Sequence, residues 1–320
     1  MRFSVAVKAF LAWMRADGKS ENTVNIYRHK LGLMVKLLED PEVAHVDGAD
    51  VLRYAKWLRD GYRPVRMSKD PSPLSTSSIL NAWCSVRAFF TWAEENKLVA
   101  HRPDGLWRQP RRTSAEVLPF SEEDVRALLA ATSHSRYAHS SRRKPFRMQR
   151  FTYRRDYAIL LVLLDTGLRA GELCRLRVQD VNQETGEVFV APFGSGRKTK
   201  SRHVWLSAPT LKSLLLYLGD RMDLPTDWLF LTRDKQPMTV NTVRLLFAAL
   251  GRKAKVQKSH PHRMRHTFAI QWLRNGGDVF TLQRMLGHST LTMVNRYLSI
   301  AVQDVANAHH TASPVDRWRL

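Results

Sequence analysis

Apolar residues in the first hundred positions recur every three or four residues, which is the spacing of amphipathic helices. The first helix is expected to end at Asp17-Gly18, and its apolar face comprises Phe3, Val7, Phe10, Leu11 and Met14. A second helix is expected between Ser20, a favourable N-cap residue, and the break at Asp40-Pro41. The chain therefore begins with helices that pack through one face.

Two further helices complete this region. A third is expected from about 47 to 58 and a fourth from 75 to 95, where the helical spacing of apolar residues returns. The stretch 61–75 between them contains three prolines and is expected to be a loop. Residues 1–100 are therefore predicted to form an all-helical bundle, and 101–118, with little periodicity, an extended basic linker.

The pattern changes in the second half of the chain. Ser121 is expected to begin a helix that runs to about 131, and 157–166 is a strongly apolar helix that ends at Gly167. Short β-branched segments bounded by turns are expected as strands, and they lie at 178–181, 188–191 and 203–206. Helices return from 211 onward. The fold class is therefore mainly α with a small β-sheet, in which a mixed α/β domain at 119–305 follows the helical one.

The segment 134–155 stands apart from these elements. It has eight basic residues, four aromatic ones besides, and no acidic residue. Two interpretations stay open, a solvated insertion or a loop that becomes ordered on phosphates.

The charge balance indicates what kind of partner the chain binds. Lysine and arginine number 51 against 29 acidic residues, which gives a net charge of +22. Residues 1–118 contribute +6 and residues 119–320 contribute +16. Such an excess in a folded chain is typical of proteins that bind a polyanion. Because both halves share the charge, both are expected to face that partner.

Several other classes of protein are excluded. A hydrophobic content of 44% argues against wholesale disorder, and no apolar run is long enough for a membrane helix or a signal peptide. Cys84 and Cys174 lie in apolar helical patterns and are expected to be buried thiols of a cytosolic protein. The sequence has no zinc-type spacing, phosphate-binding glycine loop or carboxylate cluster. No metal and no cofactor are therefore expected.

Candidate chemistry is concentrated between positions 166 and 297. Arg169 follows the helix-ending Gly167, so its side chain leaves a fixed point of the backbone, and Glu172 can buttress it or start the next helix. Farther along, two histidines and an arginine share one helix face after Pro261, a histidine follows a second helix-ending glycine, and a tyrosine lies nine residues later: His262, Arg265, His266, His288 and Tyr297. Arginine and imidazole donors can hold phosphoryl oxygens, and tyrosine can attack phosphorus.

Each of these residues has an ordinary alternative when it is taken alone. An arginine after Thr-Gly-Leu is more often a surface residue or an ion-pair partner, and a lone tyrosine near a helix end usually packs. His262 and His266 could be a zinc pair, but no glutamate lies between them and no third ligand is evident. For His266, capping or packing is the preferred interpretation. The ordered series is what favours phosphodiester chemistry.

That series resembles the tyrosine recombinases, the integrase and Xer-type enzymes of phages, bacteria and mobile elements. The matching phrases are Thr-Gly-Leu-Arg-x-x-Glu-Leu at 166–173, His-x-x-Arg-His-Thr-Phe at 262–268, Leu-Gly-His at 286–288 and the tyrosine at 297. The spacings of 23 residues from Arg265 to His288 and nine from there to Tyr297 are also those of the family. The resemblance covers nearly the whole chain and implies a core-binding domain at 1–100 and a catalytic domain at 119–305.

The resemblance also implies roles for these residues. Arg169 and Arg265 would clamp the scissile phosphate, with His262 and His288 as further phosphate donors or proton handlers. Tyr297 would attack phosphorus, form a 3′-phosphotyrosine and free a 5′-hydroxyl. The product bond keeps the energy of the broken bond, so the reaction would need neither ATP nor metal.

Three places depart from the family pattern. The turn at 194–202 lacks the lysine of the usual Gly-Lys-Gly phrase, so Lys198 is the first choice for the catalytic lysine and Lys200 the second. Met264 replaces the usual leucine at similar volume. The insertion at 134–155 is longer than the family needs. The tail at 306–320 is expected to dock on a neighbouring protomer or to fold back on its own domain.

The expected partner is double-stranded DNA with paired half-sites, bound by a dimer on each site and a tetramer in synapsis. The basic residues expected to contact it outside the site are Arg111, Arg112, Arg142, Arg143, Lys144, Arg147, Lys200 and Arg202. A bacterial, cytoplasmic, nucleoid-associated protein is expected, and the need for accessory proteins stays open. Integration or excision, dimer resolution and transposition all fit. The alternatives are a type IB topoisomerase-like enzyme and a catalytically inert DNA-binding regulator.

Overall fold

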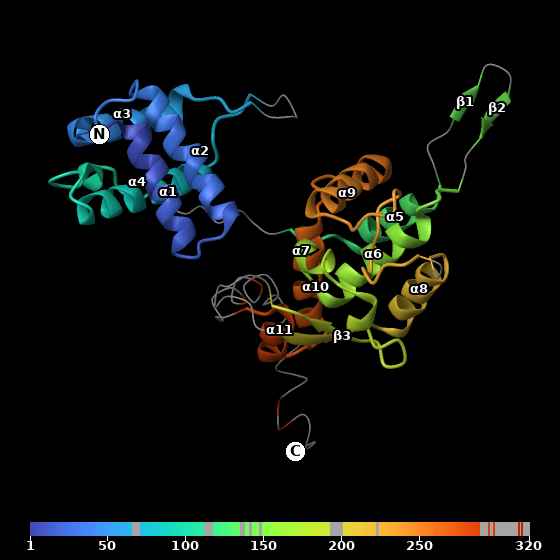
Figure 1. Ribbon diagram of the computed structural model, residues 1–320. Coiled ribbons are helices and arrows are strands. Elements are labelled where there is room, and N and C mark those ends of the chain that lie inside the picture. The colour runs from blue at the N-terminus through green and yellow to red at the C-terminus, as the bar shows by residue number, and fades with distance from the viewer. Residues whose placement is uncertain are drawn as a thin grey trace. The chain divides into compact units, whose positions relative to one another are not determined.

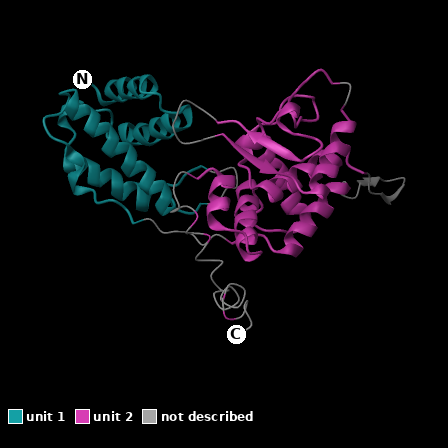
Figure 2. Cartoon of the chain, turned by 90° about the horizontal axis from the view of Figure 1, so that it is seen from below, with its two compact units in different colours: residues 1–115, 194–196 teal, residues 116–193, 197–320 magenta. Residues whose placement is uncertain are grey.

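The computed structural model describes residues 1–65, 71–111, 118–134, 138–140, 143–146, 149–192, 201–221 and 224–288, together with 294, 297, 313 and 315. The chain divides after Ala115 into two compact units (Figure 2). Among the described residues, no helix is both long and apolar enough to cross a membrane.

The first unit is a helical bundle, and the four helices expected there are confirmed. They are α1 (Phe3–Ala16), α2 (Glu21–Leu37), α3 (Gly48–Lys56) and α4 (Thr76–Glu95), with a short 3-10 helix at Val43–His45 and a π-helical turn at Trp57–Gly61 (Figure 1). The Ser20 side chain accepts a hydrogen bond from the backbone N–H of Thr23 and so caps α2. Phe3, Phe10 and Phe89 are fully buried where α1 packs against α4.

Part of the expected linker belongs to this bundle. Pro103–Leu106 forms a 3-10 helix that packs against α3 and α4. The following Trp107 is buried, and its carbonyl accepts a 2.7 Å hydrogen bond from Nε1 of Trp83. The expectation of an extended segment from 101 onward is therefore wrong for 103–107, because Trp107 supplies an aromatic anchor that a free linker lacks. Arg111 is exposed, and Arg112 lies outside the described residues.

The second unit is built around one buried helix. In the described part, its helices are α5 (Glu122–Ser133), α6 (Tyr153–Thr166), α7 (Ala170–Leu173), α8 (Ala208–Gly219), α9 (Val240–Ala254), α10 (Pro261–Arg274) and α11 (Val279–Leu286). Helix α6 packs against α5, α8 and α10, and its Ile159, Leu160 and Leu163 are fully buried. The apolar run at 157–166 is thus the core helix of this unit.

A two-stranded sheet lies beside these helices. β3 (Glu187–Val190) and β4 (Arg202–Trp205) pair antiparallel, with Val188 opposite Val204 and both side chains buried. The strand expected at 178–181 is wrong. Val178–Asp180 is a 3-10 helix, because the Asp180 carboxylate accepts a hydrogen bond from the backbone N–H of Arg177 and closes a turn.

The basic insertion contains two short strands, β1 (Ala138–Ser140) and β2 (Arg143–Phe146), which pair antiparallel. Arg143 and Lys144 lie on β2, whereas Arg142 and Arg147 lie outside the described residues. At the end of the insertion, the buried Asp156 carboxylate is contacted by Arg150 and Arg155. Because Arg155 itself lies in α6, the ion pair of Arg150 is the one that joins the end of the insertion to the first turn of that helix.

The chain enters the second unit along α10. The backbone N–H of Phe120 donates to Oγ1 of Thr267 at 2.8 Å. The guanidinium of Arg263 donates to the carbonyls of Leu118 and Pro119 at 3.1 and 3.0 Å and lies 4.1 Å from the ring centroid of Phe120. Three consecutive residues are thus anchored to one helix.

Candidate active site

Gly167 ends α6 at a point where three helices meet. Its φ of +62° is left-handed, and a Cβ there would lie 2.4 Å from Cδ1 of Phe268 and 2.9 Å from Cδ2 of Leu286. Only glycine accepts this conformation and this closeness without a shift of its neighbours. The end of α6 can therefore reach α10 and the end of α11, and Arg169 leaves the chain two residues later.

Glu172 fixes Arg169. Oε1 of the carboxylate accepts from Nη1 of Arg169 at 3.0 Å, and Oε2 accepts from the backbone N–H of the same residue at 2.8 Å. Of the two roles that the sequence suggested, Glu172 buttresses the arginine; it does not start α7, which begins at Ala170, but its side chain caps that helix. The Arg169 side chain remains 39% exposed. The guanidinium of Arg169 is therefore held by Glu172 and still partly exposed to solvent.

Arg202 occupies the other side of the same carboxylate. Its Nη1 and Nη2 donate to Oε1 and Oε2 of Glu172 at 3.1 and 2.8 Å, and its Nε donates to the carbonyl of Met285 at 2.6 Å. The side chain is 8% exposed. The expectation that Arg202 contacts DNA is therefore wrong, because its guanidinium is turned inward and used within the protein.

The charges around Glu172 decide its ionisation. Burial disfavours the carboxylate, but hydrogen bonds from Arg202, its positive charge and the contacts with Arg169 outweigh that cost. They lower the pKa of Glu172 to about 2. The carboxylate is thus ionised near neutral pH.

Helix α10 brings the expected basic residues together. His260 caps it and Pro261 occupies its first turn. Arg265 is 1% exposed, and its Nη1 and Nη2 donate to the carbonyls of Gly167 and Leu286 at 2.8 and 2.7 Å. Desolvation, followed by the charge of Arg169, lowers the pKa of Arg265 to about 9. This guanidinium is held in place by the ends of both α6 and α11.

His288 follows Gly287, which ends α11 with a φ of +64°. Its Nε2 lies 2.8 Å from Nη2 of Arg265. Because an arginine N–H can only donate, Nε2 accepts, and the proton of neutral His288 lies on Nδ1. Desolvation and the charge of Arg265 lower the pKa of His288 to about 4. Nδ1 is enclosed and has no hydrogen-bond partner among the described residues.

His262 lies one turn before His266 on α10. The two rings pack edge to face with centroids 4.2 Å apart, and His262 as a residue remains exposed. Partial desolvation and the charge of Arg265 lower the pKa of His262 to about 4. The imidazole is therefore neutral near pH 7.

Tyr297 lies within this cluster and is 3% exposed. Its hydroxyl lies 2.9 Å from Nδ1 of His266, and its ring stacks on His288 at a centroid distance of 6.4 Å. The preferred interpretation of His266, capping or packing alone, missed this hydrogen bond. The available signal was the position of His266 one turn after His262 on the same helix face.

Some predicted residues remain outside this geometry. Lys198 and Lys200 lie outside the described residues, and Arg111 belongs to the first unit. In the described ranges, no three His, Cys, Asp or Glu side chains are grouped as metal ligands. The structure thus brings together Arg169, Glu172, Arg265, His288 and Tyr297, with His262 one turn away.

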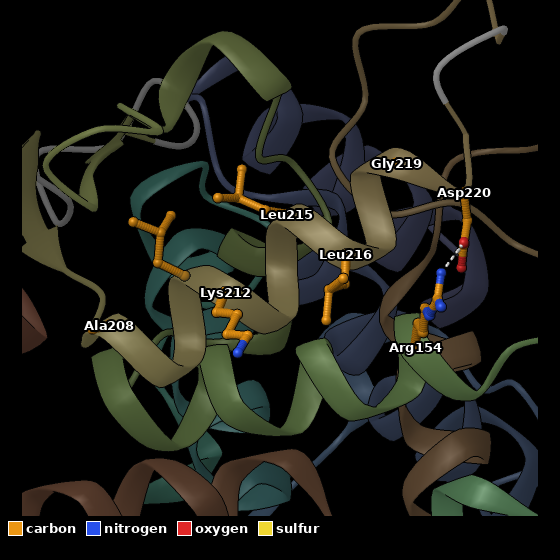
Figure 3. Close-up of a pocket in the computed structure, with 8 residues that line it drawn as sticks. Arg154, Ala208, Lys212, Leu215, Leu216, Gly219 and Asp220 are labelled. Carbon is orange, nitrogen blue, oxygen red and sulfur yellow. Dashed lines mark hydrogen bonds and ion pairs between the residues drawn. The ribbon is translucent and has the colours of Figure 1, made fainter.

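The site is separate from a surface pocket along α8. Leu215 and Leu216 line that pocket, and an ion pair between Arg154 and Asp220 closes one end (Figure 3). None of the residues in the cluster around Tyr297 lines it.

Comparison with known proteins decides the family. Residues 120–304 match the family model described as the phage integrase family, and residues 7–97 match the SAM-like N-terminal domain of phage integrases. The chain belongs to the phage integrase family. The resemblance expected from the motifs is therefore confirmed, and with it the enzyme class, the tyrosine recombinases.

Curated relatives match along nearly the whole length of this recombinase. The tyrosine recombinase XerA of Pyrococcus furiosus is 27% identical over 313 residues, covering 97% of this chain and 94% of the relative. The tyrosine recombinase XerD of Staphylococcus epidermidis is 29% identical over 320 residues, covering 96% and 98%. The tyrosine recombinase XerC of Yersinia pestis is 26% identical over 312 residues, covering 96% and 94%.

Solved structures share the fold. The XerH recombinase bound to a palindromic difH substrate aligns with a TM-score of 0.70 at 15% identity and covers 95% of this chain and 94% of that one. The Tn1549 transposon integrase in complex with circular intermediate DNA also aligns with a TM-score of 0.70, at 21% identity, and covers 95% and 98%. These matches confirm the predicted fold class, mainly α with a small sheet.

Proposed function

We propose that this protein is a site-specific DNA recombinase that cleaves and rejoins DNA strands through a 3′-phosphotyrosine, with Tyr297 as the nucleophile. The observation that carries the proposal is the position of the Tyr297 hydroxyl among His266, His288 and Arg265. A tyrosine placed only for packing has no need of two arginines and three histidines around it.

Arg169 and Arg265 are the phosphate clamp in this proposal. Attack on a phosphodiester builds negative charge on the nonbridging oxygens, and two preorganised guanidiniums neutralise it. Arg265 is fixed by backbone carbonyls and Arg169 by Glu172, so neither has to reorganise when the charge develops. Arg265 is thus the buried member of the clamp and Arg169 the partly exposed one.

His288 and His262 are the neutral donors. The Nδ1–H of His288 has no partner among the described residues, since Nε2 accepts from Arg265, and it could donate to a phosphoryl oxygen once DNA binding opens the space around it. His262 is exposed and can donate from its ring. A neutral imidazole adds a hydrogen bond without raising the positive charge already concentrated there.

The reaction balances without an external energy source. The Tyr297 oxygen forms a bond to phosphorus and loses its proton, which Nδ1 of His266, 2.9 Å from the hydroxyl, can accept. The bond from phosphorus to the 5′-oxygen breaks, and that oxygen takes a proton, for which Lys198 is the proposed donor. Rejoining runs the same steps backward with the 5′-hydroxyl of another strand as the nucleophile.

Double-stranded DNA with paired half-sites is the proposed substrate, bound by a dimer on each site and a tetramer in synapsis. The net charge of +22 supports DNA as the partner. Structural neighbours solved on DNA support it as well, among them a lambda integrase dimer bound to a core site. The proposed DNA contacts outside the site are Arg111, Arg112, Arg142, Arg143, Lys144, Arg147 and Lys200.

The test is covalent trapping on a half-site that carries a nick next to the scissile phosphate. Loss of the short flanking strand prevents rejoining, so the wild-type protein should accumulate an adduct that survives denaturation. Tyr297→Phe keeps the buried ring and should bind the same DNA without forming an adduct. An adduct of equal yield in Tyr297→Phe would disprove the assignment. Relaxation of plasmids that lack any target site would indicate a topoisomerase instead.

A further inference from the structure

Arg202 makes more contacts with the site than its position in a basic turn suggests. It is the first residue of β4, and its side chain crosses to the carboxylate of Glu172 with a two-pronged hydrogen bond. Its Nε contacts the carbonyl of Met285 near the end of α11. A Cβ on Gly287 would lie 3.1 Å from its Nη1. Its guanidinium therefore lies against the residue before His288.

Arg202 reinforces the orientation of the Glu172 carboxylate. Arg169 gives each oxygen one donor, its Nη1 for Oε1 and its backbone N–H for Oε2. The parallel fork of Arg202 gives each oxygen a second donor and holds the carboxylate from its other side.

Several basic groups face this single carboxylate. Arg169 and Arg175 belong to its own segment, and Arg202 comes from β4. Arg265 on α10 has Nη1 4.0 Å from Oε2, and His288 follows α11. The guanidinium of Arg202 donates one hydrogen bond to each oxygen, whereas that of Arg169 reaches Oε1 and that of Arg265 approaches without a hydrogen bond of normal length. Arg202 is thus the main cation that offsets the burial of Glu172.

We propose that Arg202 is a positioning residue that keeps the Glu172 carboxylate aimed at Arg169 and so sets the place of the exposed clamp arginine. The proposal rests on the function proposed above, since Arg169 is taken to bind the scissile phosphate. The guanidinium of Arg202 donates to Glu172 and to the carbonyl of Met285, so its effect on the site is exerted through Glu172.

A dependence on pH follows. With Arg202 present, hydrogen bonding and charge hold the pKa of Glu172 near 2 despite burial. Without Arg202 the burial remains while its main compensation is gone, so the pKa rises. The carboxylate form exists above that pKa. In the variant, Glu172 should therefore become protonated and stop holding Arg169 as the pH falls, in a pH range where the wild-type carboxylate stays ionised.

Arg202→Met tests this, since methionine keeps much of the apolar volume and removes the charge and the fork. The measurement is the single-turnover rate of adduct formation on the nicked half-site, given as the ratio of variant to wild type from pH 8 to pH 5. The ratio should fall by about tenfold per pH unit below the raised pKa. Glu172→Gln cannot titrate, so Arg202→Met in that background should lower the rate by the same factor at every pH.

Two matched variants separate positioning from general stability. Arg221 is also buried, but its guanidinium donates to the carbonyls of Thr226 and Leu229. Arg221→Met should lower stability without making the rate ratio depend on pH. Arg202→Lys keeps the charge and loses the fork, and it should restore a flat ratio at a reduced rate. A ratio for Arg202→Met that is flat across this range would overturn the proposal.

A second measurement keeps the proposal independent of the reaction. The unfolding free energy of wild type and Arg202→Met is compared between pH 8 and pH 5. The deficit of the variant should shrink as the pH falls, because protonation relieves a buried carboxylate that has lost its partner. If the wild type formed no adduct, the proposed function would fail, and this titration would still decide whether Arg202 holds Glu172 ionised. A constant deficit would reject that role.

Discussion

The hydroxyl of Tyr297 lies 2.9 Å from Nδ1 of His266. The ring of His266 in turn packs on His262 at a centroid distance of 4.2 Å, and the Tyr297 ring stacks on His288 at 6.4 Å. The tyrosine is therefore held by rings on two sides and by one hydrogen bond at its reactive atom. A nucleophile restrained in this way attacks from a narrow range of directions, which favours in-line displacement at phosphorus.

His266→Phe should slow cleavage while leaving DNA binding unchanged. Phenylalanine keeps the packing against His262 but removes the hydrogen bond that orients the Tyr297 hydroxyl and can accept its proton. The expected loss is about 10²-fold in the single-turnover rate, measured by adduct formation on the nicked half-site. A variant that cleaves as fast as the wild type would show that the ring acts only by packing.

Replacing each clamp arginine by lysine should separate catalysis from stability. Both Arg169→Lys and Arg265→Lys should lose most cleavage, because lysine cannot reproduce the guanidinium fork. Arg265→Lys should also lower the unfolding free energy by about 3 kcal/mol, since one ammonium cannot reproduce the two short hydrogen bonds to the buried carbonyls of Gly167 and Leu286. Arg169→Lys alters an ion pair that is partly exposed and should cost less than about 1 kcal/mol. Equal losses of stability in urea titrations would contradict this geometry.

The stability of the protein should fall as the pH drops from about 6.5 towards 4. The pKa of His288 is about 4 in the folded protein, below its value of about 6.5 in the unfolded chain, so the unfolded state binds a proton first. His288→Gln should remove this contribution and reduce the slope of unfolding free energy against pH by at most about 1.4 kcal/mol per unit. Parallel slopes for variant and wild type would place the histidine in a more solvated environment.

The lysine that protonates the 5′-oxygen can be identified with a substrate that carries sulfur at that position. Lys198→Ala should cleave normal DNA about 10²–10⁴-fold more slowly and recover on the sulfur substrate, because a thiolate leaves without a proton. Lys200→Ala should show little defect on normal DNA. If Lys200→Ala were the slow variant rescued by sulfur, the roles of the two lysines would be exchanged.

The sequence predicted the parts of the site that local rules govern. Glycine at 167 and at 287 predicted helix ends, and both adopt the left-handed conformation expected of them. Pro261 predicted the start of the helix that carries Arg265, and the structure confirms it. These positions depend on neighbours within one or two turns, which a sequence displays directly.

Contacts across long sequence separations escaped prediction. Arg202 looked like one of several basic residues in a turn, and only folding brings it to Glu172, 30 residues earlier, and to Met285, 83 residues later. His266 likewise gained its partner from a residue 31 positions away. In the same way, Trp107 belonged to no periodic pattern and became an anchor of the first unit through Trp83.

Arg263 connects the first described residues of the second unit to α10. It stands between His262 and Arg265 on α10, yet its guanidinium holds the carbonyls of Leu118 and Pro119, where the chain enters from the other unit. Residues 118–120, the first described residues of the second unit, are therefore fixed to the helix that carries the buried Arg265, within one turn of it. In the proposed reaction, one helix thus secures both the start of this unit and the guanidinium that holds the scissile phosphate.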